Sequence, residues 1–372
     1  MITRDRPSAP WGSRQHPLAG EQAGRDATVT TGRSSTGRPL WAGASPRTLD
    51  RVLDRLTARP SRRTVRRLAL ASIVANAGIV VTGGAVRLTA SGLGCPTWPK
   101  CTDDSYTPTA EYAAHGLIEF GNRLLTFVLG AVALAVLVAV WRLRPMRPGM
   151  RALALAGFLG IPAQAVLGGI TVLTGLHPWT VMGHFLVSMV LIALAVVLHR
   201  RASEGDLPPR LLVPSGLRRL TEGLLGVTAV TLALGTVVTG SGPHSGDPAA
   251  GRTGFDPATV SQLHADSVML LVGLTVALYV ALRATGADPR LVRATGVLLA
   301  VELAQGLVGY VQYFTGLPVV LVGLHLLGAC LVLVAAVRVV LATRDRGTPG
   351  TVLGTEVPRQ AGAALTLSLI HI

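Results

Sequence analysis

The sequence is poor in charged and aromatic residues. Only 14% of its 372 residues are Asp, Glu, Lys or Arg and only 4% are Phe, Trp or Tyr, whereas 49% are hydrophobic. A soluble domain needs more charge to keep its surface in water, so this composition excludes an ordinary globular domain. Apolar runs near the roughly 20 residues that cross a bilayer recur along the chain and indicate a multi-pass membrane protein.

Acidic residues are scarce as well, since 19 acids face 34 bases and the net charge is +15. In a soluble protein such an excess would indicate nucleic acid. Here the arginines gather before the first apolar run, in every second connection and after the last run, as the positive-inside rule expects of cytoplasmic segments. We therefore expect no nucleic-acid partner, a bilayer around the chain and both termini on the cytoplasmic side.

The apolar runs predict eight membrane-spanning helices. They fall at about 68–90, 116–141, 152–174, 179–198, 219–240, 259–282, 293–315 and 318–342. Residues 1–66 lack sustained apolar periodicity and are predicted to form a disordered, basic cytoplasmic tail. Because this segment has no apolar core, we do not expect it to be a signal peptide.

An internal duplication relates the two halves of the chain. A Gln, a Thr-Gly-Leu break and a His keep one spacing in both copies, at an offset of 141 residues. They occupy positions 164, 174–176 and 184 in the first copy and positions 305, 315–317 and 325 in the second. Each half then has four helices, so both halves share one orientation. The predicted fold class is an all-α polytopic membrane protein built from two tandem four-helix bundles.

The predicted domain organisation follows from this duplication. After the tail come an N-terminal half, a cytoplasmic linker, a C-terminal half and a cytoplasmic tail. Their predicted bounds are 67–200, 201–218, 219–343 and 344–372.

Single polar residues recur on the second and fourth helices of each half. His264 lies 142 residues after Asn122, so the candidate pairs are Asn122 with His184 and His264 with His325. A lone His in apolar sequence is usually a packed core residue, but matched positions in a repeat favour ligands. All four lie about 7–12 Å from the outer end of their helix. Two imidazoles on facing helices suit porphyrin iron better than zinc, which usually takes more protein ligands.

The second predicted helix also carries an acid and a base. Glu119 and Arg123 are four residues apart and share one helix face. Charged residues inside an apolar helix are costly and mark function by default. A simple salt bridge between the two is the alternative.

The chain has only three cysteines. Cys95 and Cys101 lie in one outward loop, where a disulfide can persist, and no second Cys or His pair accompanies them at zinc spacing. A disulfide is therefore favoured over a zinc pair. Cys330 lies within the last span and is predicted to be a packing residue.

Taken together, these motifs resemble the haem A synthase family. The resemblance covers about residues 68–342 and includes Leu-Thr-x-Ser-Gly-Leu-x-Cys-Pro-x-Trp-Pro-x-Cys at 88–101, Ile-Glu-Phe-Gly-Asn-Arg at 118–123 and Thr-Gly-Ser-Gly-Pro-His at 239–244. It also includes single His residues on the fourth, sixth and eighth helices.

The resemblance implies a haem B held by His264 and His325 as the electron-transfer cofactor. It implies that the first half receives haem O, whose ring methyl is oxidised to a formyl group for cytochrome c oxidase, with Glu119 as the essential acid. It places Cys95 and Cys101 beside that substrate site. Haem O synthase and cytochrome oxidase assembly factors are the implied protein partners.

The sequence departs from the family pattern at Asn122, where a haem-ligating His would be expected. Because a neutral amide is a poor iron ligand, our hypothesis is that His184 alone ligates the substrate haem. Asn122 would then hydrogen-bond a ligand on the open iron face. Arg87 and Arg123 are candidates for holding the haem propionates.

Two other functions are the alternatives. A membrane cytochrome b-type electron carrier would explain His264 and His325 but not Glu119. A duplicated transporter would predict inverted repeats or polar breaks at the membrane midplane. It is disfavoured because the halves share one orientation and the polar residues are expected near one surface.

Overall fold

The computed structural model describes residues 59–109 and 113–348, all within one compact unit, Arg59–Ile372. Eight long apolar helices make up this unit, which confirms the predicted number of spans. They are α2 (Arg62–Leu88), α3 (Ala113–Arg142), α4 (Pro148–Leu173), α5 (Pro178–Ser203), α6 (Ser215–Ser241), α7 (Pro257–Ala284), α8 (Pro289–Phe314) and α9 (Val319–Ala342). The tail predicted to be disordered, residues 1–66, lies outside the described residues except for 59–66, where α2 begins at Arg62.

Several helices extend beyond the predicted spans because local capping starts them earlier. The Ser61 side chain accepts a hydrogen bond from the backbone N–H of Thr64, so α2 begins six residues before its apolar run. The carboxylate of Asp256 caps α7 in the same way. Proline at the first helical position, where its missing N–H costs nothing, begins the helices α4, α5, α7 and α8.

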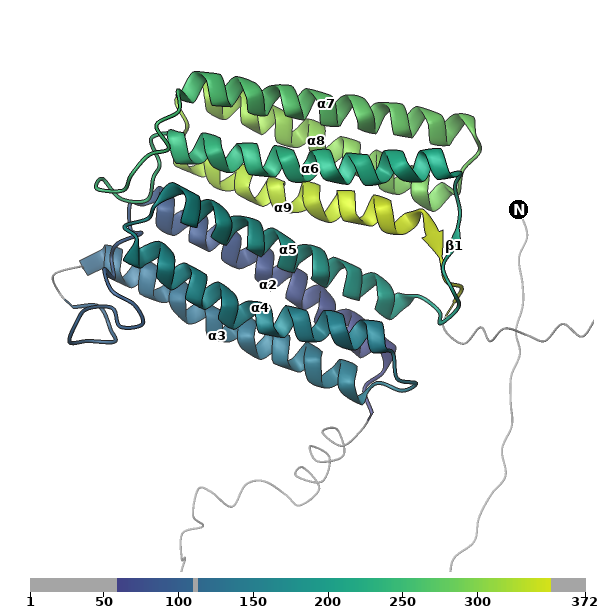
Figure 1. The fold of residues 1–372 in the computed structure, drawn as a ribbon, viewed down its shortest axis with the longest axis horizontal. Coiled ribbons are helices and arrows are strands. Elements are labelled where there is room, and N and C mark those ends of the chain that lie inside the picture. The colour runs from purple at the N-terminus through teal and green to yellow at the C-terminus, as the bar shows by residue number, and fades with distance from the viewer. Residues whose placement is uncertain (1–58, 110–112, 349–372) are drawn as a thin grey trace, which may run out of the picture. The chain divides into compact units, whose positions relative to one another are not determined.

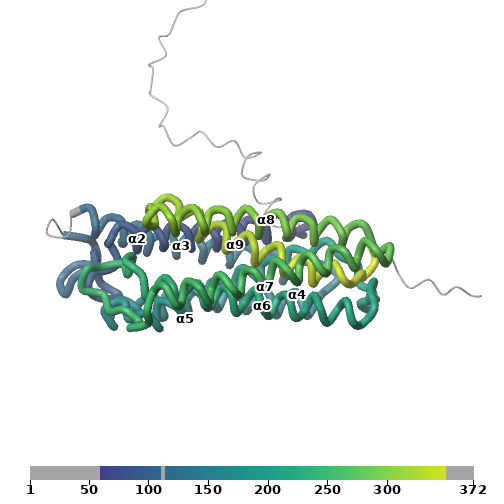
Figure 2. Tube along the Cα trace, turned by 90° about the horizontal axis from the view of Figure 1, so that it is seen from above, coloured from purple at the N-terminus to yellow at the C-terminus, as the bar shows by residue number. Residues whose placement is uncertain are grey.

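The eight helices form two layers of four (Figure 2). One layer runs α3, α2, α9, α8 and the other α4, α5, α6, α7, with α2–α5 grouped on one side and α6–α9 on the other (Figure 1). Each group is thus a square of helices. Among the described residues, α3 and α5 have no close backbone contact, and neither do α7 and α9, because each pair lies on a diagonal of its square.

Apolar packing joins the two squares along their shared side. One buried cluster combines Val80 of α2, Ile192 of α5 and Cys330 of α9. Cys330 is fully buried and unpaired, as predicted for a packing residue. The bounds predicted for the two halves stay predictions. At the predicted linker 201–218, α5 continues to Ser203 and α6 begins at Ser215.

A short sheet adds the one β-pairing found in the described ranges. The two-residue strands β1 (Arg210–Leu211) and β2 (Arg344–Asp345) pair antiparallel beside the ends of α6 and α9. The sequence did not predict these strands, because two residues carry no periodic signal.

Arginines at this end of the helices clamp the loop after α5. Arg147 is buried and donates to the backbone carbonyls of Arg201 (2.7 Å), Glu204 (3.1 Å) and Gly205 (2.6 Å). Arg62 donates to the Glu204 carbonyl at 2.9 Å. Both guanidinium groups also pair with the Asp206 carboxylate. The loop is therefore fixed to α2 and α4.

Replacing Asp206 with Asn is expected to lower stability by about 1 kcal/mol at neutral pH, because its 42% exposure lets solvent screen the pair. Burial tends to raise the pKa of Asp206, but the Arg62 hydrogen bond and the Arg147 charge outweigh it and lower that pKa. The Asp206 contribution is thus complete above the unfolded-state pKa and lost as pH falls through the folded one. Thermal unfolding in detergent measures it, with the exposed Glu222→Gln as control.

Candidate functional site

The structure brings His264 and His325 together across the second square of helices. His264 lies on α7 and His325 on α9, which are diagonal to each other. Their ring centroids are 6.4 Å apart and the ring planes make an angle of 74°. Because no helix backbone lies between diagonal partners, their side chains meet in the interior of the bundle. This is the arrangement that the repeat predicted.

A glycine on the preceding helix lies against each predicted ligand ring. A Cβ added to Gly235 would lie 3.1 Å from Cε1 of His264, and one added to Gly309 would lie 3.2 Å from Cε1 of His325. In the first half, Gly168 stands in the same relation to His184, at 3.2 Å. Any larger residue would have to displace the ring. These glycines thus leave room for the imidazoles.

Sequence reasoning missed the role of these glycines. The signal was present, because Gly168 and Gly309 keep the 141-residue register of the repeat. The sequence could not show that they contact the histidines, since this depends on how α4 and α8 are rotated against their neighbours.

The glutamines of the repeat hold the histidine-bearing backbone. Gln164 donates from Nε2 to the backbone carbonyl of His184 at 2.9 Å, and Gln305 does the same to His325 at 2.8 Å. These bonds join α4 to α5 and α8 to α9 at the level of the histidines. They fix the position of each histidine backbone rather than the tautomer of its ring.

The Thr-Gly-Leu breaks also have the same structure in both halves. Gly175 and Leu176 have φ of 62° and 58°, and Gly316 and Leu317 have φ of 79° and 61°. Two successive residues in the left-handed region reverse the chain in a tight turn, and glycine allows this at its first position. The turn sets how deeply the following helix places its histidine.

The three predicted histidine ligands each keep a ring nitrogen unpaired. Nδ1 of His184, His264 and His325 is buried without a hydrogen-bond partner among the described residues. Native proteins rarely leave buried polar atoms unsatisfied, so these three, of which His184 and His325 occupy matched repeat positions, require an explanation. A ligand bound among the helices provides one.

Asn122 occupies the position in the first half that His264 occupies in the second. Its Oδ1 accepts a hydrogen bond of 2.8 Å from the Thr82 hydroxyl on α2, and it faces Gly83. His184 lies on α5, diagonal to the α3 helix of Asn122. The first half therefore has one imidazole and one amide on facing helices.

Glu119 and Arg123 form the salt bridge that was the alternative interpretation, and this pair also anchors the outer loop. Glu119 is only 5% exposed, pairs with Arg123 and accepts a 2.6 Å hydrogen bond from the Cys95 backbone N–H. Arg123 donates to the carbonyls of Cys95 (2.9 Å), Thr97 (3.0 Å) and Lys100 (3.2 Å). The ion pair of Glu119 and Arg123 thus holds the outer loop above the first half. The salt-bridge interpretation and the functional interpretation of these two residues are therefore compatible.

The cysteines of this loop form the favoured disulfide. Cys95 and Cys101 are bonded, with Cα atoms 4.3 Å apart, and both are fully buried. Among the described residues, no three His, Cys, Asp or Glu side chains gather as a zinc site would require. Because both sulfurs lie in the disulfide, neither is a thiolate that could bind zinc, and the disulfide stays the favoured interpretation.

Neither predicted propionate arginine is free in this structure. All five N–H donors of Arg123 engage Glu119 and the loop carbonyls. Arg87 donates to the carbonyl of Thr239 (2.9 Å), near the end of α6, and to the carbonyl of His244 in the loop that follows. Arg87 therefore joins the two halves. The propionate role of both residues stays a prediction.

The rings of two outer histidines are held by hydrogen bonds to other segments. Nδ1 of His115 lies 2.8 Å from the Ser91 hydroxyl, and Nε2 of His244 lies 3.0 Å from the Leu317 carbonyl. His177 begins α5 as its N-terminal cap. None of the three joins the His264–His325 pair.

One buried acid was not predicted from the sequence. Glu302 lies near the middle of α8 and is only 3% exposed. It corrects the expectation that all polar residues of the spans lie near one surface. The signal was a single acid within the predicted span 293–315, which alone marks a candidate site.

The fold and these contacts define a multi-pass membrane protein with a paired-imidazole centre of the kind that holds haem iron in helical bundles. Comparison with known families then shows which family the chain resembles. Residues 66–244 match the COX15-CtaA family, described as cytochrome oxidase assembly protein. These residues are therefore similar to the COX15-CtaA family, over about half of the chain.

Curated relatives support this similarity. The chain is 29% identical over 185 residues to a haem A synthase of Symbiobacterium thermophilum and 35% identical over 149 residues to one of Lysinibacillus sphaericus. These alignments cover 47% and 39% of this chain and 59% and 47% of the two relatives, so the chain spans about half of each. A haem A synthase of Geobacillus thermodenitrificans is 23% identical over 320 residues, which are 82% of this chain and 99% of the relative.

Proposed function

We propose that this protein is a haem A synthase, which oxidises a ring methyl of haem O to a formyl group for cytochrome c oxidase. The observation that carries the proposal is the His264–His325 pair, a ligand set for haem iron in a chain whose relatives are named haem A synthases. We propose haem B as the resident cofactor and haem O as the substrate.

The second half fits a bis-imidazole iron. With metal–nitrogen bonds of about 2 Å on both sides, two ring centroids lie about 6 Å apart. The observed separation is 6.4 Å. The glycines Gly235 and Gly309 leave the rings unobstructed on their helix-facing sides. Haem B bound here would supply one-electron redox chemistry, and His264 and His325 would hold its iron.

The matched glycines make the fit testable. Gly309→Ala places a Cβ 3.2 Å from the His325 ring and is expected to shift the ring and weaken haem retention about tenfold. Gly306→Ala lies one turn away on α8, where a Cβ meets nothing within 4 Å, and should leave retention unchanged. The haem-to-protein ratio after purification measures both. Equal ratios in the two variants would contradict the proposed contact.

In the first half, we propose that His184 alone would hold the iron of haem O. Asn122 faces the same interior from the diagonal helix, and its Oδ1 is held by Thr82, which directs the amide N–H₂ away from Thr82 and toward other partners. Such a donor can hydrogen-bond a small ligand on the open iron face. The open face would then be available for the oxidising ligand.

Asn122→His is expected to add a second six-coordinate low-spin haem signal to that of the second half. The new imidazole would stand at the repeat position of His264, opposite His184. Low-temperature absorption and electron paramagnetic resonance of the loaded protein measure the change. If the spectra are unchanged and the activity is full, His184 is not the lone ligand that we propose.

Glu119 is the proposed essential acid. Its carboxylate is buried at the outer end of α3, three residues before Asn122, and Arg123 together with the Cys95 N–H keeps it in place. In a low-dielectric site a fixed carboxylate can stabilise positive charge that develops at a nearby carbon, or accept its proton. The disulfide loop above it would close the site from water.

We infer a cell-membrane location with both termini in the cytoplasm, because the arginine-rich connections, including the loop that contains Asp206, lie on one side. The Cys95–Cys101 loop would then face the outside. Haem O synthase and cytochrome oxidase assembly factors are the proposed protein partners, since one supplies the substrate and the others receive the product.

Expression in cells that make haem O but lack their own haem A synthase tests the proposed activity. Wild-type protein should restore haem A to the membranes, and Glu119→Ala should not. If the protein binds low-spin haem B but the membranes still lack haem A, the result would instead support a cytochrome b-type electron carrier.

A further inference from the structure

Within the described part of the chain, the buried carboxyl group of Glu302 has one hydrogen-bond partner. Its Oε1 accepts a 3.0 Å hydrogen bond from the Thr275 hydroxyl on α7, and Thr275 is completely buried. Its Oε2 is buried with no hydrogen-bond partner among the described residues. Glu302 also takes part in none of the salt bridges found there. In the interior of the bundle, one carboxyl oxygen of Glu302 is therefore hydrogen-bonded and the other is not.

Glu302 belongs to the face of α8 that serves the histidine site. Leu291, Thr295, Leu298 and Glu302 form its buried stripe. Gln305, one turn further along, bonds the His325 backbone. Thr275 lies eleven residues after His264 on α7, about 16 Å along the helix axis. The acid thus lies deeper in the membrane than the imidazole pair, below it in the same bundle.

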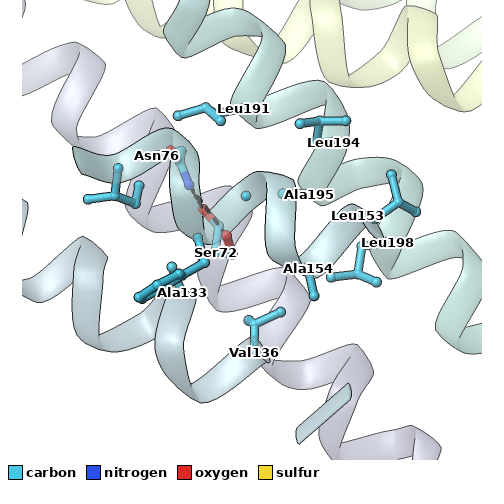
Figure 3. A pocket seen from close by; sticks show the side chains of 13 residues that line it. Ser72, Asn76, Ala133, Val136, Leu153, Ala154, Leu191, Leu194, Ala195 and Leu198 are labelled. Atoms are coloured by element: carbon cyan, nitrogen blue, oxygen red, sulfur yellow. Dashed lines mark hydrogen bonds between the residues drawn. The ribbon is translucent and has the colours of Figure 1, made fainter. Parts of the chain in front are cut away.

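The first half has a different arrangement at the same repeat position. Ile161 and Ala133 correspond to Glu302 and Thr275, at offsets of 141 and 142 residues. Both line a cavity of about 20 Å³, room for roughly one water molecule. Asn76 and Ser72 extend into it and are hydrogen-bonded to each other (Figure 3). An ionisable group at this level is thus particular to the second half.

A permanently charged carboxylate here would be costly, because burial without a counter-ion disfavours the ionised form. No cation in the described part of the chain lies within ion-pair distance of it. The titratable and charged groups on the helices packed against α8 are His264, Asp266, Tyr279 and Arg283 of α7 and His325, Cys330 and Arg338 of α9. Of these, His264 and His325 would bind an iron ion, and that ion would place a positive charge inside the bundle.

We propose that Glu302 and Thr275 form a proton-binding site in the membrane interior, and that Glu302 takes up a proton when the iron between His264 and His325 is reduced. The linkage rests on the function proposed above. A one-electron donor reduces the iron and removes one positive charge from the bundle. A proton from water then forms an O–H bond on the Glu302 carboxylate, so the net charge is restored. Oxidation reverses both events.

Carbodiimide labelling tests the proton site without any haem. Dicyclohexylcarbodiimide reacts with protonated carboxyl groups in apolar surroundings, so mass analysis of haem-free protein should find the label on Glu302. Glu119, whose carboxylate is paired with Arg123, should not be labelled. Thr295→Val, a buried change in the same stripe, should retain the label. An unlabelled Glu302 in folded protein would overturn the proposal.

Redox titration tests the linkage. In the wild type and in Thr295→Val, the midpoint potential of the low-spin haem should fall as pH rises, because reduction carries a proton. In Glu302→Gln the fall should be lost or clearly smaller. Equal slopes in wild type and Glu302→Gln would overturn the linkage. Loss of the low-spin haem from wild type would instead refute the proposed function, and the labelling result would still decide whether Glu302 binds a proton.

Discussion

His325→Ala is expected to remove the low-spin haem B signal from the purified protein. The two imidazoles are 6.4 Å apart on diagonal helices, and the loss of either would leave an iron with one protein ligand. The other ring cannot compensate, because His264 is fixed on α7 beside Gly235. We expect a near-complete loss of the six-coordinate spectrum, with any remaining haem five-coordinate.

Two variants control this experiment. His264→Ala should give the same loss, since both residues act on one iron. His199→Ala should leave the spectrum intact, because His199 lies at the far end of α5, away from the pair. Pyridine haemochrome assay and electron paramagnetic resonance measure haem content and coordination. A normal low-spin spectrum in His325→Ala would show that this pair is not the haem B site.

The second large effect is expected at Glu119. Glu119→Gln should lower the conversion of haem O by about 10²- to 10⁴-fold, the usual contribution of a positioned acid or base. The amide keeps an acceptor for the Cys95 N–H but loses the charge that pairs with Arg123. The haem B spectrum should be unchanged, since Glu119 lies on α3 and the His264–His325 pair lies on α7 and α9.

A structural explanation of a Glu119 effect must be separated from a chemical one. Removing one partner of a buried ion pair costs about 3–5 kcal/mol, so Glu119→Gln also weakens the attachment of the loop. Arg123→Gln breaks the same pair and three carbonyl contacts while leaving the carboxylate in place. If loop stability alone matters, Arg123→Gln should reduce conversion at least as much as Glu119→Gln. The proposed acid role predicts the larger loss in Glu119→Gln.

The sequence predicted the parts of the structure that have long periods or exact repeats. Eight spans followed from the apolar runs, because each is long enough to cross a bilayer. The pairing of His264 with His325 followed from the duplication, because residues at one depth on facing helices must meet. The Cys95–Cys101 disulfide was favoured because both cysteines lie in one outward loop and no second Cys or His pair accompanies them at zinc spacing.

Other features depend on helix rotation and on loop geometry, which composition does not encode. The contact of Gly309 with His325 requires one particular rotation of α8 against α9. The five donors of Arg123 reach Glu119 and the loop because residues 95–100 fold back over α3, and no periodic pattern describes that loop. The helix start at Arg62 was missed because the Ser61 cap, not hydropathy, determines it.

Glu302 is a different case, since its signal was visible in the sequence. Sequence reasoning concentrated on residues that repeat between the halves, and Glu302 has Ile161 as its counterpart. A feature that breaks a repeat is as informative as one that keeps it, because it shows where the two halves have taken different tasks.

The most direct test of the central claim is the haem content of the purified protein after expression in cells that supply haem O. Extracted haem would be separated and identified by mass for wild type and Glu119→Gln. We predict haem A or its hydroxylated intermediate together with haem B in the wild type, and haem B with unconverted haem O in the variant. Haem B alone in both proteins, with an intact low-spin spectrum, would contradict the synthase function and leave an electron carrier.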